Sequence, residues 1–240
     1  MLNNSHIGCH IAGEPTNNFS YADDLALVSP SATGLNDLLR ICEKFASKHY
    51  IVYSTTKSVC MCIPAKRAPP LAPPSIYLGG SKLEYVQAFP YLGHIITADF
   101  SDDEDIKKET RNICARGNTL IRKFKSCNDE DKRQLFITYC NSIYCNSLWQ
   151  NFRQATIQRL RVSYNNIIRR LTGQPPYCSA SMMCVGLGIK SFPEVRRTAA
   201  YSIMQRVERS SNALVCSIRC SDAYTRSHTR RQWALLLYPH

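Results

Sequence analysis

Two adjacent carboxylates, Asp23 and Asp24, lie between two short apolar stretches near the start of this 240-residue chain. Residues 18–21 before them and 25–28 after them are rich in types that suit a buried β-strand. The sequence therefore predicts a tight β-hairpin with both carboxylates at its tip. Neighbouring carboxylates repel each other, so a bound divalent cation would explain the pair. An acidic pair in a solvated surface turn is the other interpretation.

Positive charge is concentrated in the second part of the chain, and the net charge is +12. Residues 1–100 contain seven Lys/Arg and seven Asp/Glu, whereas residues 101–240 contain 23 and 11. Arginines dominate this second part and alternate with Tyr and Phe. The distribution favours a polyanion such as nucleic acid as the partner of the second part. Basic helices that are only solvated would show the same composition.

Several classes of protein are disfavoured by the composition. No apolar run approaches the roughly 18 residues of a membrane span, and the first six residues are polar, unlike a secretory signal. We expect an intracellular protein without a membrane partner, and the sequence does not distinguish nucleus from cytoplasm. The twelve cysteines are dispersed without a C-x2-C pair, which disfavours structural zinc. Cys42, Cys140 and Cys145 fall at apolar positions, so we expect reduced, buried thiols.

Residues 1–100 show mixed helix and strand signals, which predict an α+β layer. A helix is expected from Ser29, with Pro30 in its first turn, to Lys48. Strand and hairpin signals surround it, and a proline-rich segment predicts a stiff loop. These signals lie at residues 7–15 (strand and turn), 51–53 and 59–63 (strands around a polar turn), 64–75 (loop), 76–85 (hairpin at Gly79-Gly80) and 91–97 (strand).

Residues 101–220 show helical periodicity with basic outer faces and predict a helical bundle. Expected helix starts are a capping box at residues 101–104, Asn128, and a second capping box at residues 191–194. The helix from Asn128 has an apolar stripe that continues to Leu148, and the next helix ends at Gly173. The fourth is expected to turn four side chains inward: Val195, Ala199, Ile203 and Val207. Residues 221–240 have no steady period and are expected to form a loose or truncated tail.

The order of these features resembles the C-terminal half of the reverse transcriptase of a non-LTR (LINE-type) retrotransposon, of the jockey and CR1-like kind. Residues 8–13 leading to Tyr21-Ala22-Asp23-Asp24 are similar to the strand and hairpin of that family's palm, and residues 91–93 resemble its primer grip. The resemblance covers roughly residues 7 to 222. Its downstream part is carried by Leu135-Phe136, Tyr139-Cys140, Leu148-Trp149, Tyr164-Asn165-Asn166 and Ser210-Ser211-Asn212.

The resemblance implies a truncated palm-type antiparallel β-sheet with helices in residues 1–100 and an all-α, thumb-like bundle in residues 101–220. It implies Asp23 as a ligand of catalytic Mg²⁺ with Asp24 as its partner, and Lys57 beside the departing pyrophosphate. Tyr21 and Ala22 would lie beside the incoming nucleotide or template, and Tyr91, Leu92 and Gly93 would hold the primer. Lys57 as a solvated turn lysine and Tyr91 as a core residue are the alternatives. The expected nucleic-acid contacts are Lys107, Lys108, Arg111, Arg122, Lys123, Arg169 and Arg170.

The partners implied by the resemblance are an RNA template, a DNA primer or target paired with it as an RNA–DNA hybrid, and a dNTP. Ser54 replaces the asparagine usual in that family. The family's fingers and first catalytic aspartate would precede residue 1, so we expect a fragment that binds Mg²⁺ weakly and does not polymerise alone. A nucleic-acid-binding remnant without catalysis is the second hypothesis, and an inert remnant with exposed sheet edges is the third.

Overall fold

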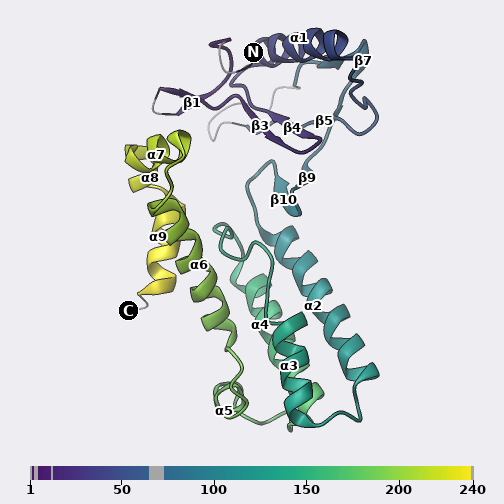
Figure 1. Ribbon diagram of the computed structural model, residues 1–240, viewed down its shortest axis with the longest axis vertical. Helices are drawn as coiled ribbons and strands as arrows, with labels where there is room; N and C mark the ends of the chain where they lie inside the picture. Colours follow the sequence, from purple (N-terminus) through teal and green to yellow (C-terminus); the bar gives the residue numbers. More distant parts are fainter. Residues whose placement is uncertain (1, 3–4, 12, 65–72, 239–240) are drawn as a thin grey trace. The chain divides into compact units, whose positions relative to one another are not determined.

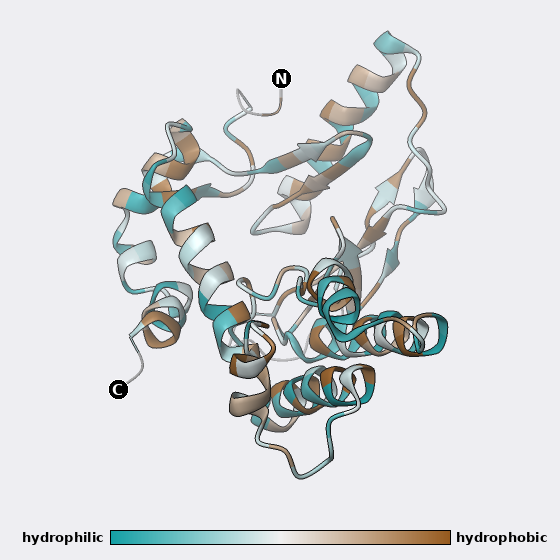
Figure 2. Cartoon of the chain, turned by 60° about the horizontal axis from the view of Figure 1, so that its bottom comes forward, coloured by the Kyte–Doolittle hydropathy of each residue, from teal (hydrophilic) through white to brown (hydrophobic). Residues whose placement is uncertain are grey.

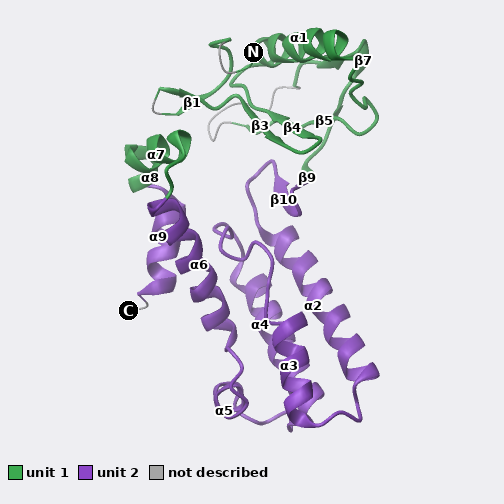
Figure 3. Ribbon diagram, viewed as in Figure 1, with its two compact units in different colours: residues 1–89, 210–225 green, residues 90–209, 226–240 purple. Residues whose placement is uncertain are grey.

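The computed structural model describes residues 2, 5–11, 13–64 and 73–238, and these form two compact units (Figures 1 and 3). Unit 1 comprises residues 1–89 and 210–225, and unit 2 comprises residues 90–209 and 226–240. The division at residue 89 lies close to the change from mixed to helical structure expected at residue 100. The α+β composition is confirmed: short strands dominate the first hundred residues and helices the remainder.

Unit 1 begins with two hairpins. Strand β1 (His10–Ile11) pairs with β2 (Glu14–Pro15), so the strand expected over residues 7–11 is a two-residue strand of a small hairpin. Strand β3 (Asn18–Tyr21) then pairs antiparallel with β4 (Asp24–Leu27). Each sheet in the described part of the chain has two strands.

Helix α1 (Ala32–His49) follows the second hairpin. Its N-cap is Ser31, whose side chain accepts a hydrogen bond from Gly34 N; the predicted start at Ser29 is therefore two residues too early. Ser29 instead forms a local turn in which its hydroxyl donates to Ser31 O (2.9 Å). The helix ends at Tyr50, which has a φ of 55°.

The rest of unit 1 packs on α1 through a small apolar core of Leu39, Cys60, Ile76, Leu78 and Leu83. The expected Gly79-Gly80 hairpin is present. Residues 51–53, expected as a strand, are irregular, and the strand expected at 59–63 is only two residues long. Within the predicted loop at 64–75, residues 65–72 lie outside the described residues. The strands here are β5 (Val59–Cys60) parallel to β8 (Glu84–Tyr85), and β6 (Tyr77–Leu78) antiparallel to β7 (Ser81–Lys82).

A fourth hairpin leads into unit 2. It consists of β9 (Ala88–Tyr91) and β10 (His94–Thr97), with Leu92 and Gly93 in the turn. The single strand expected over residues 91–97 is therefore interrupted: Tyr91 ends β9, Leu92 and Gly93 form the turn, and residues 94–97 form β10. Leu92 and Gly93 both have positive φ, 47° and 79°. Two positive-φ residues in succession are typical of the tight turns that join antiparallel strands.

Unit 2 is built on helices with apolar and polar faces, visible as brown and teal residues along each helix in Figure 2. The fully buried side chains of Ile106, Ile113, Phe136, Leu160 and Ile168 lie at the centre of its core. The helices of unit 2 are α2 (Asp103–Lys123), α3 (Asp129–Tyr139), α4 (Gln154–Thr172), α5 (Ala180–Gly186), α6 (Phe192–Glu208) and α9 (His228–Leu237). Two further helices, α7 (Ala213–Cys220) and α8 (Asp222–Thr225), belong to unit 1.

Several helix boundaries agree with the sequence signals. Asn128 caps α3 by accepting from Asp131 N (2.8 Å), Gly173 ends α4 with a φ of 67°, and Ser191 and Glu194 form a capping box at α6. The start of α2 differs from the expected capping box: Asp102 is the N-cap residue and makes no side-chain cap bond. Its carboxylate accepts instead from the Gln150 and Asn151 backbone amides.

Other expectations for the second part are wrong. Helix α3 ends at Tyr139, so the apolar residues from 140 to 148 lie in turns rather than in a continued helix. Cys145 lies there with a φ of 55° and is only partly buried. Of the four residues of α6 expected to face inward, Val195 is buried, whereas Ala199, Ile203 and Val207 are only half-buried; the other buried residues of this helix are Phe192 and Ala200.

The tail expected to be loose contains two helices, α8 and α9, in its described residues. Helix α9 packs against α6, and its Trp233 is buried and donates a hydrogen bond to Ser147 O (2.8 Å). One tryptophan provides enough apolar area to fix a helix whose sequence lacks a clear period.

All twelve cysteines are free thiols, and four of them, Cys42, Cys60, Cys140 and Cys184, are buried. Burial raises the pKa of Cys140 to about 11, which keeps this thiol protonated. None of the helices in the described part of the chain is long and apolar enough to cross a membrane.

Candidate functional site

The carboxylate pair lies at the tip of the β3–β4 hairpin, as the sequence predicted. Tyr21 pairs with Asp24, so Ala22 and Asp23 alone form the turn. Ala22 has a φ of 49°, the left-handed conformation that a two-residue turn requires at its first position. This conformation costs a residue with a Cβ about 1–2 kcal/mol, so the paired strands must hold it in place.

The two faces of this hairpin differ. Phe19 and Tyr21 lie on one face together with Asp24, because residues two apart in a strand share a face and cross-strand partners do too. Phe19 is 42% exposed and Tyr21 is 64% exposed. Leu25 and Leu27 point to the other face and are half-buried, and Leu27 packs against the core of unit 1. The hairpin therefore presents an aromatic, acidic face outward.

Asp23 and Asp24 are both exposed, and their carboxylate oxygens are ligands that Mg²⁺ prefers. Two neighbouring carboxylates fit the cation in type but not in number, since octahedral Mg²⁺ would need its other ligands from water or a substrate. Within the described residues, no group of three or more His, Cys, Asp or Glu side chains is placed to hold a metal ion.

Lys57 lies in a separate turn of unit 1, where its backbone amide donates to Ser54 O (3.3 Å). Its side chain is exposed. The described contacts do not connect it with the carboxylate turn, so its role beside a leaving group stays a prediction. Ser54 donates or accepts within the same turn, 3.1 Å from Thr56 Oγ1.

The sequence of the β9–β10 turn resembles a primer grip, and two side chains of unit 2 donate hydrogen bonds to the backbone of this turn. Tyr144 Oη donates to Leu92 O (2.8 Å), and Lys108 Nζ donates to Gly93 O. A Cβ on Gly93 would lie 3.0 Å from the Tyr144 ring, so the glycine is required for both its φ and the close approach. Tyr91 is half-buried, which leaves both the core and the primer-binding interpretation open.

Beneath this turn lies a buried polar network centred on Asp105, whose side chain is fully buried. Its carboxylate accepts from Ile95 N (3.0 Å), Lys108 Nζ (2.6 Å) and Trp149 Nε1 (2.8 Å). His94 Nδ1 lies 2.9 Å from Asp105 Oδ2. The sequence analysis missed this network, although an acid one turn into a helix beside a strand His was a signal that could have indicated it.

The protonation states in the network follow from these contacts. The contact with Asp105, followed by that with Cys145, raises the pKa of His94 to about 9 even though burial opposes it. Burial alone would raise the pKa of Asp105, but His94, Lys108 and Trp149 hold it well below its ordinary range. His94 is therefore a partly buried cation and Asp105 its buried anion. Burial raises the pKa of Asp102, which lies 3.6 Å from His94 Nε2.

A basic surface runs along α2 and α4. The two helices run parallel. Near their starts Asp103 accepts a hydrogen bond from Arg153 N (3.0 Å), and near their ends Arg170 donates one to Asn118 Oδ1 (3.2 Å). Residues 110–123 and 154–172 contain no Asp or Glu. We call the exposed surfaces of these two helices the α2/α4 basic face; its exposed cations are Arg111, Arg122, Lys123, Arg159 and Arg170, whereas Arg161 is exposed but points toward the start of α6. The sequence analysis named four of these cations and missed Arg159.

Three other cations expected to contact nucleic acid have partners within the chain. Lys107 Nζ lies 2.7 Å from Glu104, and Lys108 joins the Asp105 network. Arg169 donates to Asn166 Oδ1 (3.0 Å) and Cys178 O (3.0 Å). The structure gives Lys108 and Arg169 structural contacts, and their binding to nucleic acid stays a prediction.

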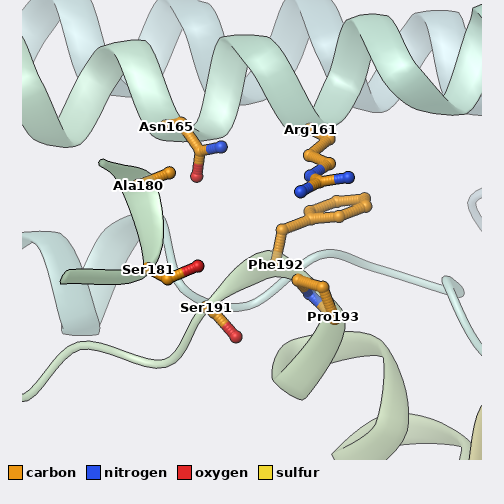
Figure 4. A pocket seen from close by; sticks show the side chains of 7 residues that line it. All are labelled: Arg161, Asn165, Ala180, Ser181, Ser191, Phe192 and Pro193. Atoms are coloured by element: carbon orange, nitrogen blue, oxygen red, sulfur yellow. The ribbon is translucent and has the colours of Figure 1, made fainter. Parts of the chain in front are cut away.

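A small cavity of about 60 Å³ lies where α4 meets the starts of α5 and α6. Figure 4 shows Arg161 and Asn165 pointing from α4 toward Ser181, Ser191 and the ring of Phe192. The polar groups at the start of α6 are already satisfied, because Ser191 N and Oγ both donate to Glu194 Oε2 (2.6 Å each). This volume suits one or two water molecules rather than a substrate.

Comparisons of the chain with protein-family models, with curated proteins and with solved structures find no match.

Proposed function

We propose that this chain contains the metal-binding hairpin, primer-grip-like turn and thumb-like helices of an RNA-directed DNA polymerase of a non-LTR retrotransposon. The observation that carries the proposal is the β3–β4 hairpin, whose two-residue turn holds Asp23 and Asp24 exposed at its tip. The order of motifs in the sequence supports it, and so does the α2/α4 basic face downstream.

The proposed reaction is nucleotidyl transfer to a primer 3′-hydroxyl. Mg²⁺ supplies, when bound, a lowered hydroxyl pKa and stabilisation of charge on the transferred phosphoryl group. Asp23 would hold the cation with Asp24 beside it, and Tyr21 would pack against the incoming nucleotide or template from the same face. Lys57 would offer positive charge to the leaving pyrophosphate.

We expect the chain alone to bind Mg²⁺ weakly and not to polymerise, because two neighbouring carboxylates offer few of the ligands that Mg²⁺ needs. Incorporation of dNTPs on a primed RNA template, abolished in Asp23→Ala, would contradict this expectation.

The metal site is tested directly with Mn²⁺, which substitutes for Mg²⁺ and broadens NMR signals of nearby amides. We expect broadening centred on residues 21–25 that is lost in Asp23→Asn/Asp24→Asn. Asp37→Asn is the matched control, since Asp37 is an acid of α1 paired with Arg40. Broadening that persists in the double variant, or that centres on Asp37, would overturn the proposed site.

A second candidate function is nucleic-acid binding without catalysis, favoured by the absence of acidic residues from the α2/α4 basic face. If about five phosphates are neutralised, the logarithm of affinity should fall with the logarithm of salt concentration at a slope near −4.5. Binding that does not depend on salt would exclude it.

A further inference from the structure

A second basic surface lies at one end of the helix pair α6 and α9, which pack against each other. Helix α9 runs back alongside α6, so the end of α6 and the start of α9 lie together (Figure 1). Arginines cluster there from both helices. We call this cluster the α6/α9 arginine end; its members are Arg206, Arg209, Arg226, Arg230 and Arg231, all exposed.

The charge at this end is unbalanced. Glu208 is the one acidic residue among residues 195–209 and 226–238, whereas the same two ranges contain seven arginines. On α6 the cations suit their position, because the C-terminal end of a helix attracts positive charge. On α9 this is not so: Arg231 lies near the start of the helix, which carries positive partial charge and has no acidic residue in its first turn. An anion bound at this end would relieve that repulsion.

The arginines are held on a fixed framework. Ser227 caps α9 by accepting from Arg230 N (3.1 Å), and Trp233 is 4% exposed and donates to Ser147 O. Because α9 is anchored by this buried tryptophan, little backbone entropy is lost when a ligand binds to its first turn.

The type of cation indicates the partner. Residues 191–240 contain eight arginines and no lysine. Lysine would serve solubility equally well, whereas the planar guanidinium binds two phosphate oxygens at once. We propose that the α6/α9 arginine end is a second nucleic-acid contact that binds backbone phosphates. This inference rests on the proposed nucleic-acid-binding function and assigns a contact to residues that function did not include.

The test measures how binding of a labelled RNA–DNA hybrid duplex by the full chain depends on salt. Three double variants are compared with the parent: Arg226→Gln/Arg231→Gln at the α6/α9 arginine end, Arg111→Gln/Arg122→Gln on the α2/α4 basic face, and Lys44→Gln/Lys48→Gln as a control on α1. Each removes two exposed charges. We expect the first to reduce the magnitude of the log–log slope by about 1.8, since each phosphate contact contributes about 0.9. The control should leave the slope unchanged.

The outcomes separate the inference from the proposed function. A slope reduced only by Arg111→Gln/Arg122→Gln overturns the second contact and leaves nucleic-acid binding intact. Equal slopes in all variants, or no binding by the parent, overturn both. Displacement of the duplex by poly-glutamate at equal charge would assign the α6/α9 arginine end to acidic polypeptides and overturn the inference.

A second measurement does not depend on the folding of the variants. Phenylglyoxal modifies accessible arginines, and mass spectrometry of the parent chain locates the modified sites. We expect the duplex to protect Arg226 and Arg231 from modification while Arg40 on α1, which is exposed, stays reactive. Equal modification with and without duplex contradicts the second contact.

Discussion

At the scale of single residues, Asp105 is the centre of the buried polar network of unit 2. It is fully buried and accepts from two side chains and one backbone amide while lying beside His94. Asp105→Asn keeps the shape but removes the charge, leaving His94 and Lys108 without their counterion. We expect the free energy of unfolding to fall by about 3–5 kcal/mol, as for other broken buried ion pairs. Urea denaturation followed by tryptophan fluorescence measures it.

The control for this prediction is Asp37→Asn, which breaks a surface ion pair with Arg40 at 2.9 Å. Exposed pairs contribute about 0–1 kcal/mol, so the control should unfold almost like the parent. Equal effects of the two substitutions would show that the Asp105 network does not stabilise the unit.

The charged His94 gives stability a pH dependence. Its folded pKa of about 9 lies above its ordinary value of 6.5, so its contribution is complete below pH 6.5 and is lost as pH rises toward 9. The depressed pKa of Asp105 has the opposite sense: its contribution is present above its ordinary value of 3.8 and is lost as pH falls below it. We expect stability to decline between about pH 6.5 and 8.5 by at most 1.4 kcal/mol per pH unit.

His94→Gln should flatten this decline, as measured by urea midpoints at successive pH values. The range stops at about 8.5 because unfolded cysteines begin to ionise there. A variant that keeps the full decline would assign the pH dependence to another group.

At the scale of elements, the packing of α2 on α4 depends on Gly117. A Cβ at this position would lie 2.5 Å from Ile167 Cγ2, closer than any real contact. Gly117→Ala should therefore destabilise unit 2 by about 1–3 kcal/mol despite the better helix propensity of alanine. Ile167→Ala in the same chain should remove this penalty, so thermal melts of both single variants and the double variant test the pair.

Gly186 in α5 is the matched control, since nothing lies within 4 Å of a Cβ there. Gly186→Ala should raise the melting temperature slightly, because alanine loses less entropy on folding. A destabilising Gly186→Ala would mean that glycine replacement itself, rather than contact with Ile167, explains the result at Gly117.

Local signals predicted elements well where the chemistry is local. The Ala22–Asp23 turn, the Gly79-Gly80 hairpin, the Asn128 cap and the Ser191–Glu194 capping box all depend on residues within four positions of one another. The predictions that failed concern residues whose structure depends on contacts with residues far away in the sequence. Asp102 accepts from the amides of residues 150 and 151 instead of capping α2, and Trp233 reaches Ser147 to order a helix that has no periodic pattern of its own.

In the candidate site, too, the features formed by neighbouring residues were predicted and those formed by distant residues were not. The sequence predicted the carboxylate turn because its two strands and two turn residues are contiguous. It did not predict the Asp105 network, whose members come from β10, α2 and the segment before α4. The α2/α4 basic face was predicted only in part, since which arginines are exposed depends on helix packing.

At the scale of the whole molecule, the two units differ in the cores that stabilise them. The apolar core of unit 1 is small and its sheets have two strands each in the described residues, whereas unit 2 buries a continuous core between α2, α3, α4 and α6. Two-stranded sheets are marginal in water without such packing. We therefore expect unfolding in two transitions, unit 1 first, because separate cores need not melt together.

Hydrogen exchange resolved by residue tests this order. Amides of α2 and α4 should exchange slowest, while those of β1 to β8 exchange through local opening at much lower free energy. Phe136→Ala should lower the second transition alone, by about 3–5 kcal/mol, since its ring is fully buried in unit 2. A single transition with uniform protection would mean that the carboxylate hairpin is as rigid as the helices and would contradict this order of unfolding.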